Sequence, residues 1–223
     1  HEDGRFSHYR FLRSGPACVL VDTGIIAAAP TRMLVAGIGD ALSTWFEAEE
    51  AALQGWNNVA GTRPSGFALA VARECFETVT AHGLKALQEL REDRLGESFE
   101  RIVEANILLS GIGFESGGLG TAHAIQNGLA TLAQCRGVLH GELVNIGLLA
   151  MLRLGRTGPG LFAQVRDLGA ALGLPVRLAD IGLDGVPVEL LHEAASFSCT
   201  PAPMNRIASG ILPKDIVAAL MEL

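Results

Sequence analysis

The stretch LVAGIGDALSTWF, at residues 34–46, decides the fold because its large apolar side chains recur at the spacing of an α-helix. The same periodicity continues through an alanine-rich run to Leu53, and it predicts one long helix, or two end to end, after Pro30. A second stretch, GELVNIGLLAML at residues 141–152, is apolar around most of a helical circumference, which is typical of a buried helix. Two such segments indicate a protein built mainly from helices.

Shorter periodic segments extend this pattern along the chain. They predict helices over residues 67–83, 97–109, 122–132, 139–154, 161–172 and 188–195, and a last helix that begins at Pro213. The convincing strands are two short β-prone runs between residues 8 and 23, joined by a Gly-Pro turn. Five glycines between residues 111 and 120 predict a tight passage between two helices. A phosphate loop is not expected there, because no strand precedes the glycines and no Lys-Ser/Thr pair follows them.

The composition excludes several classes of protein. A length of 223 residues corresponds to one large domain, or to one domain plus a piece of another. The 17 basic and 24 acidic residues give a formal net charge of −7, without the basic patch that nucleic acid or an anionic membrane surface requires. No apolar run approaches the roughly 20 residues that span a bilayer, and the four cysteines form no CxxC pair. We expect a cytoplasmic protein with free thiols that binds neither nucleic acid nor a membrane.

Three polar residues interrupt strongly apolar helical segments, and burial of an unpaired polar group costs a few kcal/mol. They are Asp40, His123 and His140. Each has a simple structural explanation by itself, as an acid at a helix start, a core histidine and a helix cap, respectively. Together, one carboxylate and two imidazoles on three helices are the ligand set of an open tetrahedral zinc site. The interval between the two histidines fits no local motif such as HExxH, so the sequence leaves the geometry open.

Three ordered blocks of the chain resemble a known family. They are VLVDTGIIAAAPTRMLVAGIGDALSTWFEAE at residues 19–49, ANILLSGIGFESGGLGTAHAIQNGL at residues 105–129 and LHGELVNIG at residues 139–147. The family is the iron- or zinc-dependent alcohol dehydrogenase superfamily, and the blocks look most like its glycerol dehydrogenase branch. The resemblance implies a multi-helical domain like that of dehydroquinate synthase at residues 30–223. It also implies that residues 1–29 are the last short strands of an N-terminal α/β domain that binds NAD.

The resemblance also implies roles for individual residues. The aspartate and the two histidines named above match the ligands of a catalytic zinc ion, and the same set tolerates iron. Phe114 matches a position that lines the substrate pocket, with plain core packing as the alternative. Asn127 and Glu142 are expected near the site, where they either orient the histidines or complete helix ends. Many members have a second histidine where this chain has Gln126, a departure that bears on substrate preference.

The activity implied by the resemblance is oxidation of glycerol, or of a related small diol, to the hydroxy-ketone with NAD+ as the hydride acceptor. Zinc would activate the substrate as a Lewis acid, with no separate catalytic residue. Family members are homo-oligomers and bind NAD through a glycine-rich loop that is not found in this chain. We therefore assign no NAD-binding residue, take the chain to be incomplete at its N-terminus and expect it to be inactive alone.

Two other interpretations stay open. In the first, the superfamily is the same but the substrate is a phosphorylated polyol, or the enzyme is a lyase like dehydroquinate synthase. Such anionic substrates need several Lys or Arg side chains near the metal blocks, and between the two histidine blocks the chain offers Arg136. In the second, the chain is a non-catalytic helical module, because the nucleotide-binding loop is not found in it.

Overall fold

The computed structural model describes residues 15–155, 158–201 and 205–223, and in these residues it contains helices and no strand. The helices are α1 (Thr23–Ala28), α2 (Thr31–Gln54), α3 (Gly66–Arg91), α4 (Glu97–Glu104), α5 (Ser110–Gly117), α6 (Thr121–Leu129), α7 (His140–Leu154), α8 (Pro159–Leu172), α9 (Val188–Ser198) and α10 (Pro213–Met221). A π-helical turn, Ala105–Leu109, joins α4 to α5, and short 3-10 turns lie at Ala133–Cys135 and Leu178–Ile181. The expected multi-helical, mainly α fold class is confirmed.

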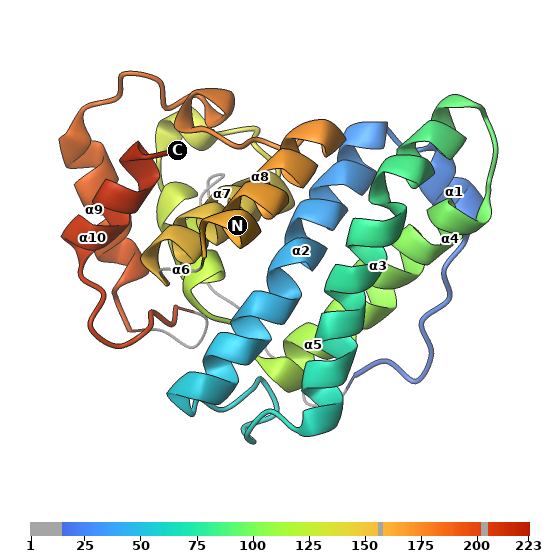
Figure 1. The fold of residues 1–223 in the computed structure, drawn as a ribbon, viewed down its shortest axis with the longest axis horizontal. Coiled ribbons are helices and arrows are strands. Elements are labelled where there is room, and N and C mark those ends of the chain that lie inside the picture. The colour runs from blue at the N-terminus through green and yellow to red at the C-terminus, as the bar shows by residue number, and fades with distance from the viewer. Residues whose placement is uncertain (1–14, 156–157, 202–204) are drawn as a thin grey trace.

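Two groups of buried apolar side chains share α7, which lies near the middle of the molecule (Figure 1). The larger group is formed by α2, α3, α4, α7 and α8, and it contains Leu42, Phe99 and Leu148. The smaller group is formed mainly by α6, α7, α9 and α10, and it contains Ile146 and Ile216. Every residue of α7 from 141 to 152 is buried, as its apolar sequence predicts. Helix α7 therefore connects the two halves of the core.

Of the two longest helices, α2 agrees with expectation and α3 is longer than expected. Helix α2 is a single helix of 24 residues that ends at Gly55, whose left-handed φ of 66° favours glycine. The expected end of the next helix near Gly83 is wrong, because α3 continues to Arg91. Gly83 is buried, and a Cβ atom there would lie 3.2 Å from a methyl carbon of Leu172 on α8. This glycine is explained by close helix packing and not by helix termination.

The glycine-rich passage is also shorter than expected. The chain continues from α4 through the π-helical turn into α5, so the predicted helix end at residue 109 is wrong and several of the glycines lie inside a helix. A Cβ atom at Gly113 would lie 2.6 Å from the methyl carbon of Thr44 on α2, so glycine is needed there for packing. The tight turn begins at Gly118, whose φ of 107° favours glycine.

The strand expected at residues 18–23 is not formed. Residues 18–22 precede α1, which begins at Thr23. The carboxylate of Asp22 accepts hydrogen bonds from the N–H groups of Gly24 and Ile25 and so caps this helix. A strand also needs a neighbouring strand for its hydrogen bonds, and the described residues supply none. The first β-prone run, before residue 15, lies outside the described residues. The assignment of residues 1–29 to an N-terminal domain stays a prediction.

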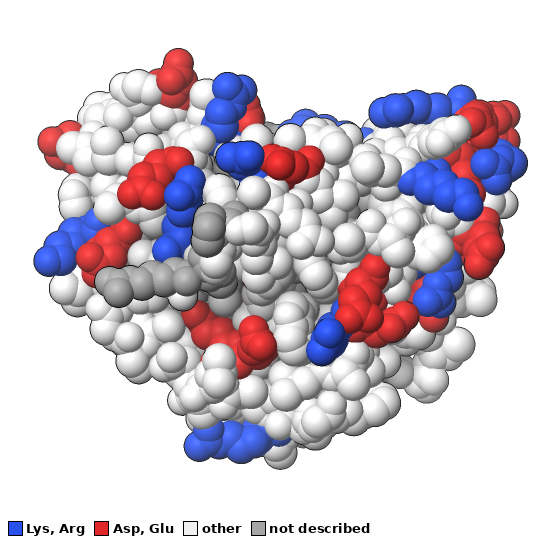
Figure 2. Space-filling view, viewed as in Figure 1, with Lys and Arg blue, Asp and Glu red and all other residues white. Residues whose placement is uncertain are grey.

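Two features bear on the partners that the sequence excludes: the distribution of surface charge concerns nucleic acid, and the helix lengths concern membranes. On the face shown in Figure 2, lysines and arginines are interspersed with acids and form no basic patch. Among the residues that the structure describes, no helix is both long and apolar enough to cross a membrane. The exclusion of nucleic acid stays a prediction from the charge balance.

We predict that Gly141→Ala lowers the free energy of unfolding by more than about 2 kcal/mol. A Cβ atom at this position would overlap the backbone carbonyl of Ala36 and force α7 away from α2. Gly111→Ala is the control, because Gly111 is exposed in α5 and a Cβ there would have no neighbour within 4 Å. Alanine should leave its stability unchanged or raise it by up to about 1 kcal/mol. Urea unfolding followed by circular dichroism measures both, and equal midpoints would contradict this packing.

Candidate metal centre

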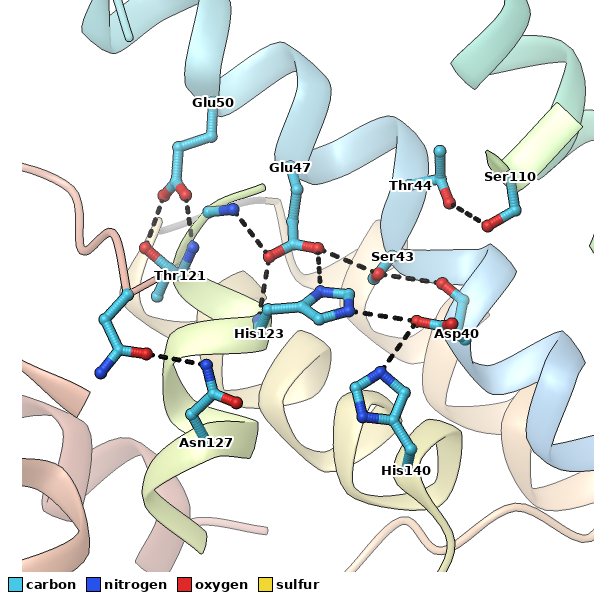
Figure 3. A network of polar contacts seen from close by, with 12 residues as sticks. Asp40, Ser43, Thr44, Glu47, Glu50, Ser110, Thr121, His123, Asn127 and His140 are labelled. Atoms are coloured by element: carbon cyan, nitrogen blue, oxygen red, sulfur yellow. Dashed lines mark hydrogen bonds and ion pairs between the residues drawn. The ribbon is translucent and has the colours of Figure 1, made fainter. Parts of the chain in front are cut away.

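Helix α2 presents a row of polar side chains toward α5, α6 and α7 (Figure 3). At helical spacings of three and four residues, the row consists of Asp40, Ser43, Thr44 and Glu47. The backbones of α2 and α7 approach closely, since a Cβ atom at Gly39 would lie 2.5 Å from the carbonyl oxygen of Gly141. This close approach lets short side chains of α2 reach the start of α7.

The three ligands predicted from the sequence lie together. Asp40 comes from the middle of α2, His123 from the first turn of α6, and His140 is the first residue of α7. Oδ1 of Asp40 lies 3.2 Å from Nε2 of His123 and 3.6 Å from Nε2 of His140. One ligand atom from each residue lies within 4.8 Å of the other two. Ligand atoms about 2.0 Å from a tetrahedral zinc ion are about 3.3 Å apart, so the separations are close to those of a metal centre.

The charges at this point favour a cation. Burial would raise the pKa of Asp40, but hydrogen bonds from His123 and His140 outweigh it and hold that pKa well below its usual range. Burial would likewise lower the pKa of His123, but the facing carboxylates of Glu47 and Asp40 raise it to about 10. A positive charge is therefore stabilised between these carboxylates. A divalent metal ion would replace the proton on Nε2, so the donor set fits zinc.

Asp40, His123 and His140 line a cavity of about 240 Å³. Phe114 of α5 also lines it, and its contact with a substrate stays a prediction. Asn106 and the hydroxyl pair of Thr44 and Ser110, whose oxygens are 3.0 Å apart, add neutral polar groups. His140 is exposed whereas His123 is buried, so the centre is open on one side. An open position is what a catalytic metal needs for a substrate.

Glu142 and Asn127 form hydrogen bonds that connect α7 and α6 to neighbouring segments. Glu142 accepts two hydrogen bonds of 2.6 Å from the guanidinium of Arg32 and one of 2.7 Å from the N–H of Leu139, just before α7. It therefore completes the start of α7 and connects it to α2, which favours the helix-end interpretation. The amide of Asn127 donates to Asn205 at 2.7 Å, and this contact connects α6 to the segment after α9.

Two carboxylates of α2 were missed by the sequence analysis. Glu47 is fully buried, and its Oε2 lies 2.6 Å from Nδ1 of His123. Glu50 accepts hydrogen bonds of 2.7 and 2.8 Å from the N–H and the hydroxyl of Thr121. The sequence held a signal for the first of them: Glu47 follows Asp40 by two helical turns, and an acid on the buried face of an apolar helix needs a partner.

Glu50 makes the stability of the fold depend on pH. Burial raises its pKa to about 7, although hydrogen bonds from Thr121 lower it. A carboxyl group whose pKa is higher in the folded than in the unfolded chain stabilises the fold at low pH. That contribution is lost as the pH rises from about 4.5 to about 7.

We predict that Glu50→Gln removes this pH dependence, because glutamine does not ionise. Between about pH 5 and pH 8, the wild-type chain should lose stability relative to the variant, by up to about 1.4 kcal/mol for each unit by which the pKa is raised. Unfolding temperatures of both proteins, measured by calorimetry at one fixed zinc concentration, give the comparison. Parallel pH profiles would show that Glu50 is not the group responsible.

Curated relatives match nearly the whole chain, although no protein-family model matches it. The chain is 48% identical over 219 residues to the glycerol dehydrogenase of Thermotoga maritima, a match that covers 98% of this chain and 60% of the relative. It is 39% identical to the glycerol dehydrogenase of Pseudomonas putida, with 99% of this chain and 60% of the relative covered. The chain thus spans about 60% of the length of these relatives.

Solved structures agree with the sequence comparison. The crystal structure of glycerol dehydrogenase from Schizosaccharomyces pombe superposes with a TM-score of 0.94 at 33% identity, over 100% of this chain and 57% of that one. A probable glycerol dehydrogenase from Sinorhizobium meliloti gives 0.95 at 34% identity, over 99% of this chain and 63% of that one. In sequence and in fold, the chain therefore resembles the helical C-terminal portion of glycerol dehydrogenases.

Proposed function

We propose that this chain forms the metal-binding part of an NAD-dependent glycerol dehydrogenase that uses zinc. The observation that carries the proposal is the convergence of Asp40, His123 and His140 at the wall of a cavity of about 240 Å³. Relatives named glycerol dehydrogenase, which match nearly the whole chain, support it. Because the chain spans about 60% of their length, the activity of the whole protein is part of the proposal.

The residues of this chain have separate tasks in the proposed conversion of glycerol and NAD+ to dihydroxyacetone and NADH. Asp40, His123 and His140 hold the metal ion, which when bound supplies Lewis-acid polarisation of a substrate hydroxyl. Phe114 provides an apolar wall for the carbon chain. The hydroxyls of Thr44 and Ser110 provide neutral polar groups suited to a polyol.

The cavity favours a neutral substrate over a phosphorylated one. Its lining contains the carboxylates of Asp40 and Glu47 and, within the described part of the chain, neither Lys nor Arg. A phosphate group is bound by cationic side chains and is repelled by carboxylates. A phosphorylated polyol and the substrate of a lyase like dehydroquinate synthase are therefore both disfavoured, whereas glycerol carries no charge.

The proposal extends to features that belong to the whole protein. We propose that it is a cytoplasmic homo-oligomer and that NAD is bound mostly by residues other than those assigned to the metal centre. Large apolar side chains at the surface support the oligomer, since Leu53 is 81% and Phe67 is 69% exposed. Burial of such side chains is a common source of subunit association.

We predict that the chain retains about one zinc ion after dialysis against metal-free buffer. Asp40→Asn and His123→Ala should lose it, because each removes a ligand. Asp22→Asn is the matched control, since Asp22 caps α1 outside the cavity and asparagine caps a helix equally well. Metal content is measured by mass spectrometry. Zinc retained at wild-type stoichiometry in Asp40→Asn would contradict the ligand assignment.

The activity is measured as NADH formation by the full-length protein that contains this chain. We expect NADH formation to be faster with glycerol than with glycerol phosphate, because the described residues that line the cavity include two carboxylates and neither Lys nor Arg to bind a phosphate. Asp40→Asn should reduce the rate to background, whereas Asp22→Asn should retain it. Faster turnover of the phosphate ester, or wild-type rates in a variant that holds no metal, would overturn the proposed function.

A further inference from the structure

Glu47 is a buried carboxylate with more partners than helix packing requires. Its Oε1 accepts hydrogen bonds of 2.9 Å from the backbone N–H groups of Gly120 and His123. Its Oε2 faces Nδ1 of His123 at 2.6 Å and the hydroxyl of Ser43 at 3.1 Å. The side chain is completely inaccessible to solvent. One carboxylate thus holds both the backbone and the ring of a proposed metal ligand.

A purely structural role for Glu47 would be to cap α6. Glu50, the next carboxylate of α2 along this face, also caps α6. Helix α6 begins after Gly120, which offers no side-chain cap. Glu50 accepts from the N–H and the hydroxyl of Thr121 in the same first turn. The two acids therefore share the work of capping α6, where the helix dipole favours negative charge. Glu47 also contacts the imidazole ring of His123 and the hydroxyl of Ser43, whereas Glu50 contacts Thr121.

That bond determines which nitrogen of His123 faces the other ligands. A carboxylate accepts hydrogen bonds and does not donate them, so the hydrogen between Glu47 and the ring resides on Nδ1. Nε2 is then the nitrogen available to a metal, and it points toward Oδ1 of Asp40 (Figure 3) at 3.2 Å. With the opposite tautomer, the lone pair would face a carboxylate and Nε2 would be unable to bind a metal ion.

We propose that Glu47 is a positioning residue of the metal centre. It holds His123 in the tautomer and orientation that directs Nε2 to the point where Asp40 and His140 converge. It also fixes the start of α6 to α2, so that the ligand and the helix carrying it are held by the same carboxylate. The inference rests on the proposed metal site and adds a residue that does not touch the metal.

The test compares Glu47→Gln with Glu50→Gln in the full chain. Both substitutions remove a charge from the cap of α6, but Glu47→Gln alone alters the partner of the His123 ring. We expect zinc affinity, measured by competition with a chromogenic chelator, to fall about 10- to 100-fold in Glu47→Gln. In Glu50→Gln it should stay within about threefold of wild type, because the contacts of His123 are retained. The visible spectrum of the cobalt-substituted chain should change in Glu47→Gln alone.

Two results would overturn the inference while leaving the metal site intact. They are zinc affinity in Glu47→Gln equal to that of wild type, and an equal loss in both variants, which would indicate a capping role alone. Failure of the wild-type chain to bind zinc would instead overturn the proposed site. If Glu47→Gln does not fold, nitrogen-15 NMR of the zinc-loaded wild-type chain decides the question. A proton on Nδ1 of His123 with zinc on Nε2 is expected, and zinc on Nδ1 would overturn the inference.

Discussion

Helix α2 lies against α7 at close to backbone contact, and the geometry of the site depends on this approach. Helices with ordinary side chains between them pack with their axes about 8–10 Å apart. Gly39 and Gly141 have no Cβ atom, so the two backbones meet directly. As a result Asp40, a short side chain in the middle of α2, comes within 3.6 Å of His140 at the start of α7. A longer separation would leave these two side chains unable to bind the proposed metal ion together.

The contact between α2 and α6 places two acidic side chains of α2 against the start of α6. Glu47 and Glu50 are buried or largely buried, and such carboxylates are costly unless they are hydrogen-bonded. The first turn of α6 supplies N–H groups that have no partner within their own helix, so the two acids and the helix end satisfy one another. Of these two acids, Glu47 contacts both the start of α6 and the ring of His123.

Local sequence patterns predicted most of the helices, and they failed where a glycine serves packing. Amphipathic periodicity is a property of neighbouring residues, so α2 and α7 were expected from their sequences alone. Gly83 and Gly113 look like helix breakers for the same reason, whereas in the fold they face Leu172 and Thr44 on other helices. The strand expected at residues 18–23 failed because strand formation depends on a partner that the described residues do not supply.

The sequence by itself determined the helical class and the three candidate ligands, because polar residues in apolar helical segments and the blocks of family resemblance are visible without coordinates. The tertiary structure alone decided how far apart the candidate ligands lie, which side chains line the cavity and that Glu47 pairs with the ring of His123. These features depend on how α2, α6 and α7 pack. Glu47 and His123 are 76 positions apart in the chain, and a local pattern carries no information about a contact across that distance.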